Sequence, residues 1–320
     1  VRVVNLARAL DEIAETGFDP QRIDDRYSVG VCENLFEGLL TYDYLARPAK
    51  LVPEAAEALP VVTDGGRTYT LKVRQGLYFA DDPVFKSEPR EVTARDYAYA
   101  IRRFLDPANR SPYAFLFEGK IVGLDALAAR AKKTSRYDYD APIAGLQTPD
   151  RYTLRIRLRE PDFNFAHLLA FHLTGAVARE AIETYGVNSA AHPVGSGPFM
   201  LKSYTRSSKI VLEANPRYRE RVWDFEPGDD PLDREIAARM QGKKLPQLGR
   251  IEISIMEETQ SRWLAFIGGQ TDVEPVGALA NPGMDGFFLL DDVAAGRWRI
   301  EARLDGFRPF ADTRTVGPGE

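Results

Sequence analysis

The strongest constraint on the fold is a regular interleaving of strand-like and helix-like segments through residue 274. Residues 67–73 (RTYTLKV) and 151–158 (RYTLRIRL) alternate polar and apolar side chains, as does a strand with one buried face. Between them, Thr93 begins a helix with Asp96 as its capping-box acid and Pro107 as its stop. The apolar stripe of that helix is Tyr97, Ala100, Ile101, Phe104 and Leu105. Such interleaving predicts an α/β fold.

The remaining periodic segments extend this pattern. Strands are predicted at residues 1–6, 196–203, 208–212 and 250–256, and helices at residues 29–40, 165–178 and 260–266. The charged stretch 227–247, rich in Pro and Gly, predicts a surface excursion. Two strand-like runs at 287–293 and 297–304 predict a β-hairpin tail after residue 275, with no helix following it.

Net charge and cysteine content exclude several classes of protein. The chain has 320 residues and a net charge of −5, which argues against a general nucleic-acid binder. The basic run Arg130–Lys133 is interpreted as a solvated face. Cys32 is the single cysteine, so the chain has no internal disulfide and no metal site built from several thiolates. Its apolar neighbours predict a small buried core residue.

The ends of the chain leave its cellular location open. No stretch approaches the roughly 18 apolar residues of a membrane span. The sequence begins Val-Arg-Val-Val, without Met or a signal peptide, as expected of a mature exported protein or of a trimmed chain.

Nothing in the sequence assembles a catalytic or cofactor site. His167 and His172 are five residues apart, off the spacing of a helical metal pair, and His192 precedes a proline. No G-x-S-x-G motif accompanies them. The glycines of residues 195–198 (GSGP) lack the lysine and helix of a phosphate loop, so we interpret them as a turn that leads into a strand. We therefore predict no enzyme and no cofactor, although carboxylates are too plentiful to exclude a carboxylate-pair hydrolase.

Three segments, in order, resemble a known family. Residues 19–40 contain DPQRIDDRYSVGVCENLFEGLL, residues 91–113 contain EVTARDYAYAIRRFLDPANRSPY, and residues 192–218 contain HPVGSGPFMLKSYTRSSKIVLEANPRY. Together they resemble the family 5 extracellular solute-binding proteins of bacterial ABC importers, which include the oligopeptide- and dipeptide-binding proteins. The resemblance runs from residue 1 to about residue 274.

The resemblance implies a periplasmic-binding-protein-like lobe with a mixed sheet. Residues 1–274 would form lobe one, with an inserted subdomain at about 41–172, and residues 275–320 would form the β-rich tail. A second lobe, which in this family closes on the ligand about a hinge, has no counterpart here. We therefore expect a truncated or rearranged member with half a cleft and weak binding.

The resemblance also implies ligand-binding residues. Asp24 lies where peptide-binding members place an acidic or polar residue toward the ligand, and Arg26 is a weaker candidate beside it. Tyr113 matches a tyrosine that faces the cleft and offers a flat apolar face with one hydroxyl. A solvated loop acid and a tyrosine packed beneath a loop are the structural alternatives. Glu37-Gly38 is expected to end the helix and allow a close chain approach.

The expected function is therefore capture of a solute for an ABC permease, in the periplasm or at the cell surface. A short peptide is the first candidate ligand, and metal chelates, haem and oligosaccharides are further ones in the family. The alternative is an interaction module in which the tail hairpin pairs with another chain or a second copy, since an isolated hairpin exposes two strand edges.

Overall fold

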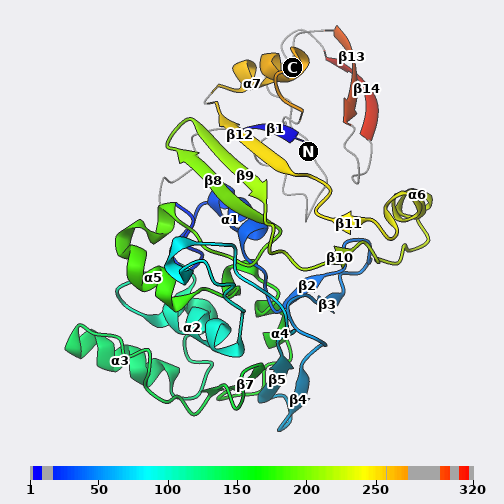
Figure 1. Cartoon of the computed structure of the whole chain (residues 1–320). Coiled ribbons are helices and arrows are strands. Elements are labelled where there is room, and N and C mark those ends of the chain that lie inside the picture. The colour runs from blue at the N-terminus through cyan, green and yellow to red at the C-terminus, as the bar shows by residue number, and fades with distance from the viewer. Residues whose placement is uncertain (1–2, 9–16, 257, 273–295, 303–309, 317–320) are drawn as a thin grey trace.

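The computed structural model describes residues 3–8, 17–256, 258–272, 296–302 and 310–316. A mixed four-stranded sheet lies in the upper half of the molecule as drawn in Figure 1, below α7 (Thr259–Ile267) and the pair of β13 (Gly296–Ala302) and β14 (Phe310–Val316). Its strands, in spatial order, are β1 (Val3–Arg8), β12 (Arg250–Ile255), β9 (Lys209–Ala214) and β8 (Phe199–Thr205). β1 runs parallel to β12, and β9 runs antiparallel to both β12 and β8. The predicted α/β class and mixed sheet are confirmed.

A second, antiparallel sheet occupies the opposite end of the molecule (Figure 1). Its order is β4 (Val61–Thr63), β5 (Thr68–Lys72), β7 (Thr153–Arg157) and β6 (Leu146–Gln147). Tyr69, Leu71, Leu154 and Ile156 are buried on its inner face. The strands predicted at 67–73 and 151–158 are β5 and β7, as their alternation required. β2 (Leu40–Tyr42) and β3 (Leu51–Pro53) form a separate antiparallel pair.

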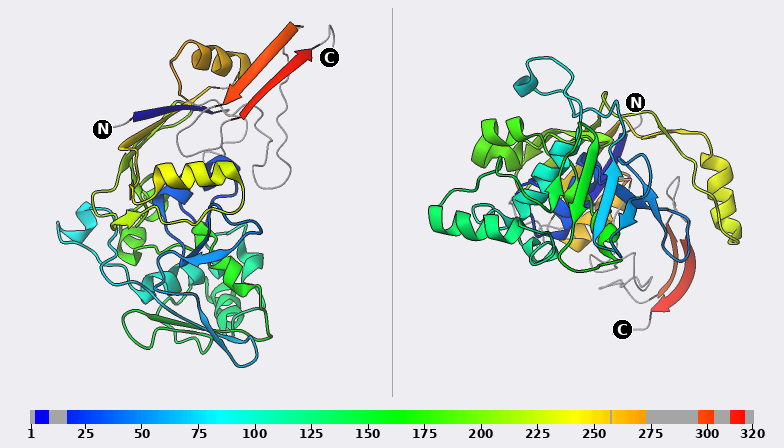
Figure 2. Two further views of the ribbon diagram at one scale, coloured as in Figure 1. Left: turned by 90° about the vertical axis from the view of Figure 1, so that its right-hand side faces the viewer. Right: turned by 90° about the horizontal axis from the view of Figure 1, so that it is seen from below.

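Helices pack between and beside the two sheets (Figure 2). They are α1 (Arg26–Leu35), α2 (Ala94–Leu105), α3 (Leu124–Thr134), α4 (Phe165–Leu168), α5 (Arg179–Tyr185), α6 (Pro231–Met240) and α7 (Thr259–Ile267). Short 3₁₀ turns are η1 (Pro83–Phe85), η2 (Ala114–Leu116), η3 (His172–Thr174) and η4 (Gly186–Ala191). The cap predicted for α2 is present, because Asp96 accepts hydrogen bonds from the Thr93 amide at 2.7 Å and hydroxyl at 2.9 Å.

One hydrophobic core joins α1, α2 and the inner faces of both sheets. Cys32 lies fully buried in it, as predicted, and burial raises the pKa of its thiol well above the usual value. The run Arg130–Lys133 keeps Arg130, Lys132 and Lys133 exposed, which confirms the predicted solvated face.

Two predicted helices are wrong in extent. The helix predicted at 29–40 begins earlier and ends at Leu35, since Phe36 is extended and Leu40 already belongs to β2. The helix predicted at 165–178 is only α4 followed by η3. Tight packing explains both: the backbones at Gly38 and Leu169 are so close that a β-carbon on Gly38 would lie 3.0 Å from the Leu169 carbonyl oxygen. A continuous helix through either segment would break that contact.

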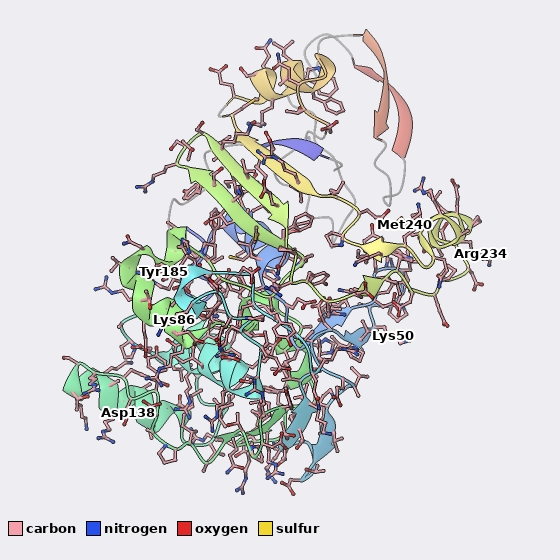
Figure 3. The ribbon with its side chains drawn as sticks, in the orientation of Figure 1. Lys50, Lys86, Asp138, Tyr185, Arg234 and Met240 are labelled. Carbon is pink, nitrogen blue, oxygen red and sulfur yellow. The ribbon has the colours of Figure 1, made fainter. Side chains whose placement is uncertain are left out.

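The predicted surface excursion is an arm with its own small core. Residues 219–247 project from the body and contain α6 and the antiparallel pair β10 (Arg221–Val222) and β11 (Lys244–Leu245) (Figures 1 and 3). Figure 3 shows Arg234 and Met240 on this arm. The helix was not predicted. Its buried side chains Ile236, Ala237 and Met240 pack with Trp223 and Leu45, away from the main core.

The tail contains one described hairpin. β13 (Gly296–Ala302) pairs antiparallel with β14 (Phe310–Val316). The strand predicted at 287–293 lies outside the described residues, and the strand predicted at 297–304 overlaps β13. The boundaries at 274 and at 41–172, and the expected lack of a second lobe, stay predictions.

Candidate ligand-binding site

The loop that carries the candidate acids is anchored from behind by a buried ion pair. Arg103 of α2 donates to Asp19 through Nη1 to Oδ1 at 2.8 Å and through Nη2 to Oδ2 at 2.6 Å. The same guanidinium contacts the Gln21 side-chain oxygen. The side-chain Nε2 of Gln21 donates to the Leu173 carbonyl at 2.8 Å. Burial opposes ionisation of Asp19, but the charge and hydrogen bonds of Arg103, together with the hydrogen bond from the Gln21 backbone amide, outweigh it and hold the Asp19 pKa below its usual value.

Asp25 connects this loop to α1. Its Oδ1 accepts a hydrogen bond from the Ser28 amide at 2.7 Å, so Asp25 is the N-cap of α1. Its Oδ2 is buried and has no partner among the described residues. Burial raises the pKa of Asp25, and the neighbouring Asp24 adds to that effect. Asp24 itself is exposed. The side chain of Arg26 lies outside the described residues.

Tyr113 lies within range of the charges of these two acids. Its ring packs edge-on against Phe171, with centroids 5.4 Å apart, and the residue is half-buried. Burial raises the pKa of Tyr113, and the charges of Asp24 and Asp25 add to that effect. The charge of Asp24 thus acts on Tyr113, and the contact of Asp24, Tyr113 and Arg26 with a ligand stays a prediction.

His172 completes this group, and sequence reasoning missed it. Its Nε2 is buried without a described partner, and so is the Ser28 hydroxyl. Burial lowers the pKa of His172 to about 4, so the ring is neutral at pH 7, and its backbone contact is with Val29 of α1. With Asp25 Oδ2, these are three polar atoms at the first turn of α1 that are buried and unsatisfied. Such atoms usually have a hydrogen-bond partner.

A second polar cluster lies at the other end of α1. Glu37 is buried, and its Oε1 accepts from the Tyr218 hydroxyl at 2.9 Å and from Arg219 Nη2 at 3.0 Å. Glu54 accepts from Arg221 Nη1 at 2.8 Å. Burial and repulsion by Glu37 raise the pKa of Glu54 to about 7. Gly38 makes the predicted close approach, whereas the network around Glu37 was not foreseen.

The turn predicted at residues 195–198 packs directly on the end of α1. The Gly197 amide donates to the Leu35 carbonyl at 2.9 Å, and a β-carbon on Gly195 would overlap the same carbonyl oxygen. The segment continues into β8. It is therefore a turn that leads into a strand, as predicted, and its glycines allow close chain contact.

The histidines form local pairs. His192 Nε2 lies 2.6 Å from Asp82 Oδ2, and the other oxygen of Asp82 accepts from the Tyr185 hydroxyl at 2.6 Å. His167 Nδ1 lies 2.8 Å from the Tyr42 hydroxyl. Within the described part of the chain, no three His, Cys, Asp or Glu residues are grouped as they would be to hold a metal ion.

Comparison with known proteins places the chain in a family. Residues 50–284 match the family described as "Bacterial extracellular solute-binding proteins, family 5 Middle". The periplasmic oligopeptide-binding protein OppA of Salmonella typhimurium is 31% identical over 209 residues, which cover 64% of this chain and 34% of that protein. The glutathione-binding protein GsiB of Escherichia coli O1:K1 is 27% identical over 218 residues, which cover 68% of this chain and 35% of that protein.

Solved structures agree on the fold. Peptide-bound OppA of Listeria monocytogenes superposes with a TM-score of 0.63 at 22% identity, covering 84% of this chain and 45% of that one. A periplasmic oligopeptide-binding protein of Borrelia burgdorferi gives a TM-score of 0.64 at 22% identity, and the superposition covers 86% of this chain and 47% of that one. The chain spans about a third of the length of the curated relatives that it matches. None of the helices described here is both long and apolar enough to cross a bilayer.

Proposed function

We propose, because this chain belongs to the bacterial extracellular solute-binding proteins of family 5, that it captures a short peptide or similar extended solute for an ABC importer. The family consists of substrate-binding proteins rather than enzymes. The proposed location is the periplasm or cell surface, and the proposed partner is the permease. The observation that carries the proposal is the group of unsatisfied polar atoms of Asp25, Ser28 and His172, beside Tyr113.

The chemistry of this group suits the end of a peptide. The carboxylates of Asp24 and Asp25 can accept hydrogen bonds from an ammonium group or from main-chain N–H groups, and charge-assisted bonds of this kind are the strong ones. Tyr113 offers a flat ring that tolerates different side chains. Two adjacent acids repel free carboxylates, so we expect a peptide with a basic amino terminus to bind more tightly than glutathione.

An NMR titration of the backbone amides with a lysine-containing tripeptide tests the proposal. The described residues would contact the ligand from one side, so we expect a dissociation constant on the order of 100 μM to 1 mM. Asp24→Asn should weaken binding about tenfold, as expected for losing a charged hydrogen-bond partner. Tyr113→Ala should weaken it by a similar factor.

The matched control is Asp229→Asn, which removes a fully exposed carboxylate on the arm. It should leave the dissociation constant unchanged. The proposal fails if the wild-type protein shows no shifts around α1 at millimolar peptide, or if Asp229→Asn and Asp24→Asn have equal effects.

A second candidate function rests on the tail hairpin. Among the described strands, β13 and β14 pair only with each other, so both outer edges of this two-stranded sheet are available. Under this alternative, the hairpin pairs with a second copy of the chain. Light scattering should then give a dimer mass that reverts to a monomer mass when residues 275–320 are deleted. A monomer mass for the full chain would exclude it.

A further inference from the structure

Gln21 is a buried side chain that joins two parts of the candidate site. It lies in the loop that carries Asp24 and Asp25, and it is 0% exposed, so it offers a ligand no surface to contact. Its Oε1 accepts a hydrogen bond from Arg103 Nη1, and its Nε2 donates to the Leu173 carbonyl at 2.8 Å. A guanidinium has only donors, so the amide oxygen of Gln21 has to face Arg103 and the nitrogen has to face Leu173.

The Arg103 end of this link is fixed. Arg103 makes the two bonds to Asp19 described above, and Asp19 Oδ1 also accepts from the Gln21 backbone amide at 3.2 Å. Gln21 is therefore bonded through its backbone and its side chain to one buried ion pair, which leaves its Nε2 a single place from which to hold Leu173.

The Leu173 end belongs to η3. Leu173 is fully buried, and among the described residues no donor other than Gln21 is bonded to its carbonyl. A buried carbonyl without a partner is costly. Without the Gln21 amide, η3 would have to shift toward another donor or leave this oxygen unpaired.

η3 in turn carries the support of the Tyr113 ring. Phe171 immediately precedes η3, and its carbonyl accepts from both the amide and the hydroxyl of Thr174, each at 2.8 Å. Phe171 is thus tied to η3, and its ring packs edge-on against Tyr113 with centroids 5.4 Å apart. A displacement of Leu173 is passed through Phe171 to Tyr113.

We propose that Gln21 is a positioning residue, which sets the place of the Tyr113 ring relative to the loop of Asp24 and Asp25 by holding η3 to that loop. Its effect on a ligand rests on the proposed function, whereas its effect on Tyr113 does not. A ligand that contacts both parts needs this spacing, because binding groups have to be held within about 0.5 Å of their productive geometry.

The aromatic NMR signals of the ligand-free protein give the first test. The contact between Phe171 and Tyr113 should give a cross-peak between the two rings and a ring-current shift of the Tyr113 signals. Gln21→Met keeps the size of the side chain but removes both polar atoms, so it should move the Tyr113 signals and weaken this cross-peak. Phe171→Leu tests the link from its other end, and should move the side-chain amide signals of Gln21.

Titration with the lysine-containing tripeptide gives the second test. Gln21→Met should weaken binding about three- to tenfold, as is typical of a change that acts through intermediate contacts. Phe171→Leu should weaken it as well. Because Gln21 acts through Phe171, the double variant should bind within about twofold of the weaker single variant, whereas the effects of independent sites would multiply.

Asn215→Leu is the matched control. Asn215 is also buried, its Nδ2 donates to the Gly197 carbonyl at 3.0 Å, and its Oδ1 accepts from the Arg217 amide at 2.9 Å. The variant removes the same two kinds of hydrogen bond, so it should lower the midpoint of urea denaturation as Gln21→Met does. It should leave the Tyr113 signals and the dissociation constant unchanged.

Two results would overturn the inference whether or not the tripeptide binds. One is a set of Tyr113 signals that Gln21→Met leaves unchanged or that Asn215→Leu moves equally. The other, should Gln21→Met fail to fold, is Gln21 amide signals that do not respond to Phe171→Leu. Multiplied losses of affinity in the double variant would also contradict it. Tyr113 signals that respond to Gln21→Met in a protein that binds no peptide would support the positioning role and remove the proposed function.

Discussion

Arg103 and Asp19 form a bidentate ion pair in which the two side chains are only 2% and 1% exposed. Arg103 comes from α2 and Asp19 from the loop that precedes α1. The pair therefore fixes the loop that carries Asp24 and Asp25 against the core of the protein. Breaking one side of a buried pair leaves an uncompensated charge, which is far more costly than losing a surface pair.

Arg103→Met should therefore destabilise the protein by about 3–5 kcal/mol, because Asp19 would remain buried without its partner. Urea denaturation followed by circular dichroism measures the change. Arg151→Met is the control, since Arg151 is 58% exposed in its ion pair with Glu91 and should cost less than about 1 kcal/mol. Similar values for the two variants would show that the buried pair does not anchor the loop.

Glu54 should make stability depend on pH. Its pKa is raised to about 7 in the folded protein by burial and by Glu37, so the folded state keeps a proton that the unfolded state loses near pH 4.5. Between these values the folded state binds more protons, and stability falls as pH rises. Glu54→Gln removes this proton-linked loss of stability. The free energy of unfolding of the variant, relative to that of the wild type, should therefore rise by on the order of 2 kcal/mol from pH 4.5 to pH 7.

Denaturation of both proteins at several pH values measures this difference. His172 titrates in the opposite sense, because its pKa is lowered to about 4, but it is present in both proteins and cancels. A constant difference between Glu54→Gln and the wild type across this pH range would contradict the prediction.

Two glycines near α1 should respond to alanine in opposite directions. Gly195→Ala would place a β-carbon against the Leu35 carbonyl oxygen, so the chain must move, and we expect a loss of about 2 kcal/mol or more. Gly30→Ala adds a methyl group inside α1 with no atom within 4 Å, and should stabilise by about 0.5–1 kcal/mol. Thermal melts compare the two, and a neutral Gly195→Ala would refute the close approach.

Asp25 should have separable structural and binding roles. Asp25→Ala removes the N-cap of α1 and should cost about 1 kcal/mol, whereas Asp25→Ser retains a capping oxygen and should cost less. Both variants remove the buried Oδ2, so both should weaken peptide binding in the NMR titration. If Asp25→Ser bound peptide as well as the wild type, this oxygen would have no part in the site.

Local sequence patterns correctly predicted the helices and strands that are specified by side chains close together in the sequence. The alternation at 67–73 and 151–158 gave β5 and β7, and the Thr93–Asp96 pair gave the start of α2, because capping and strand periodicity depend on residues close in sequence. The resemblance also indicated Asp24 and Tyr113, and the Asp24 charge raises the pKa of Tyr113, while their role in binding stays a prediction.

Long-range contacts decided the rest. Arg103 lies three residues after Ala100 on the apolar stripe of α2, a signal that it is buried, but only the fold brings Asp19 to it from 84 residues away. The same holds for His172 beside α1 and for Glu37 with Arg219. The sequence by itself determined the α/β pattern, the capped helix and the buried cysteine. The tertiary structure decided where α1 ends and which polar groups are buried, because those outcomes depend on chain contacts that no local period encodes.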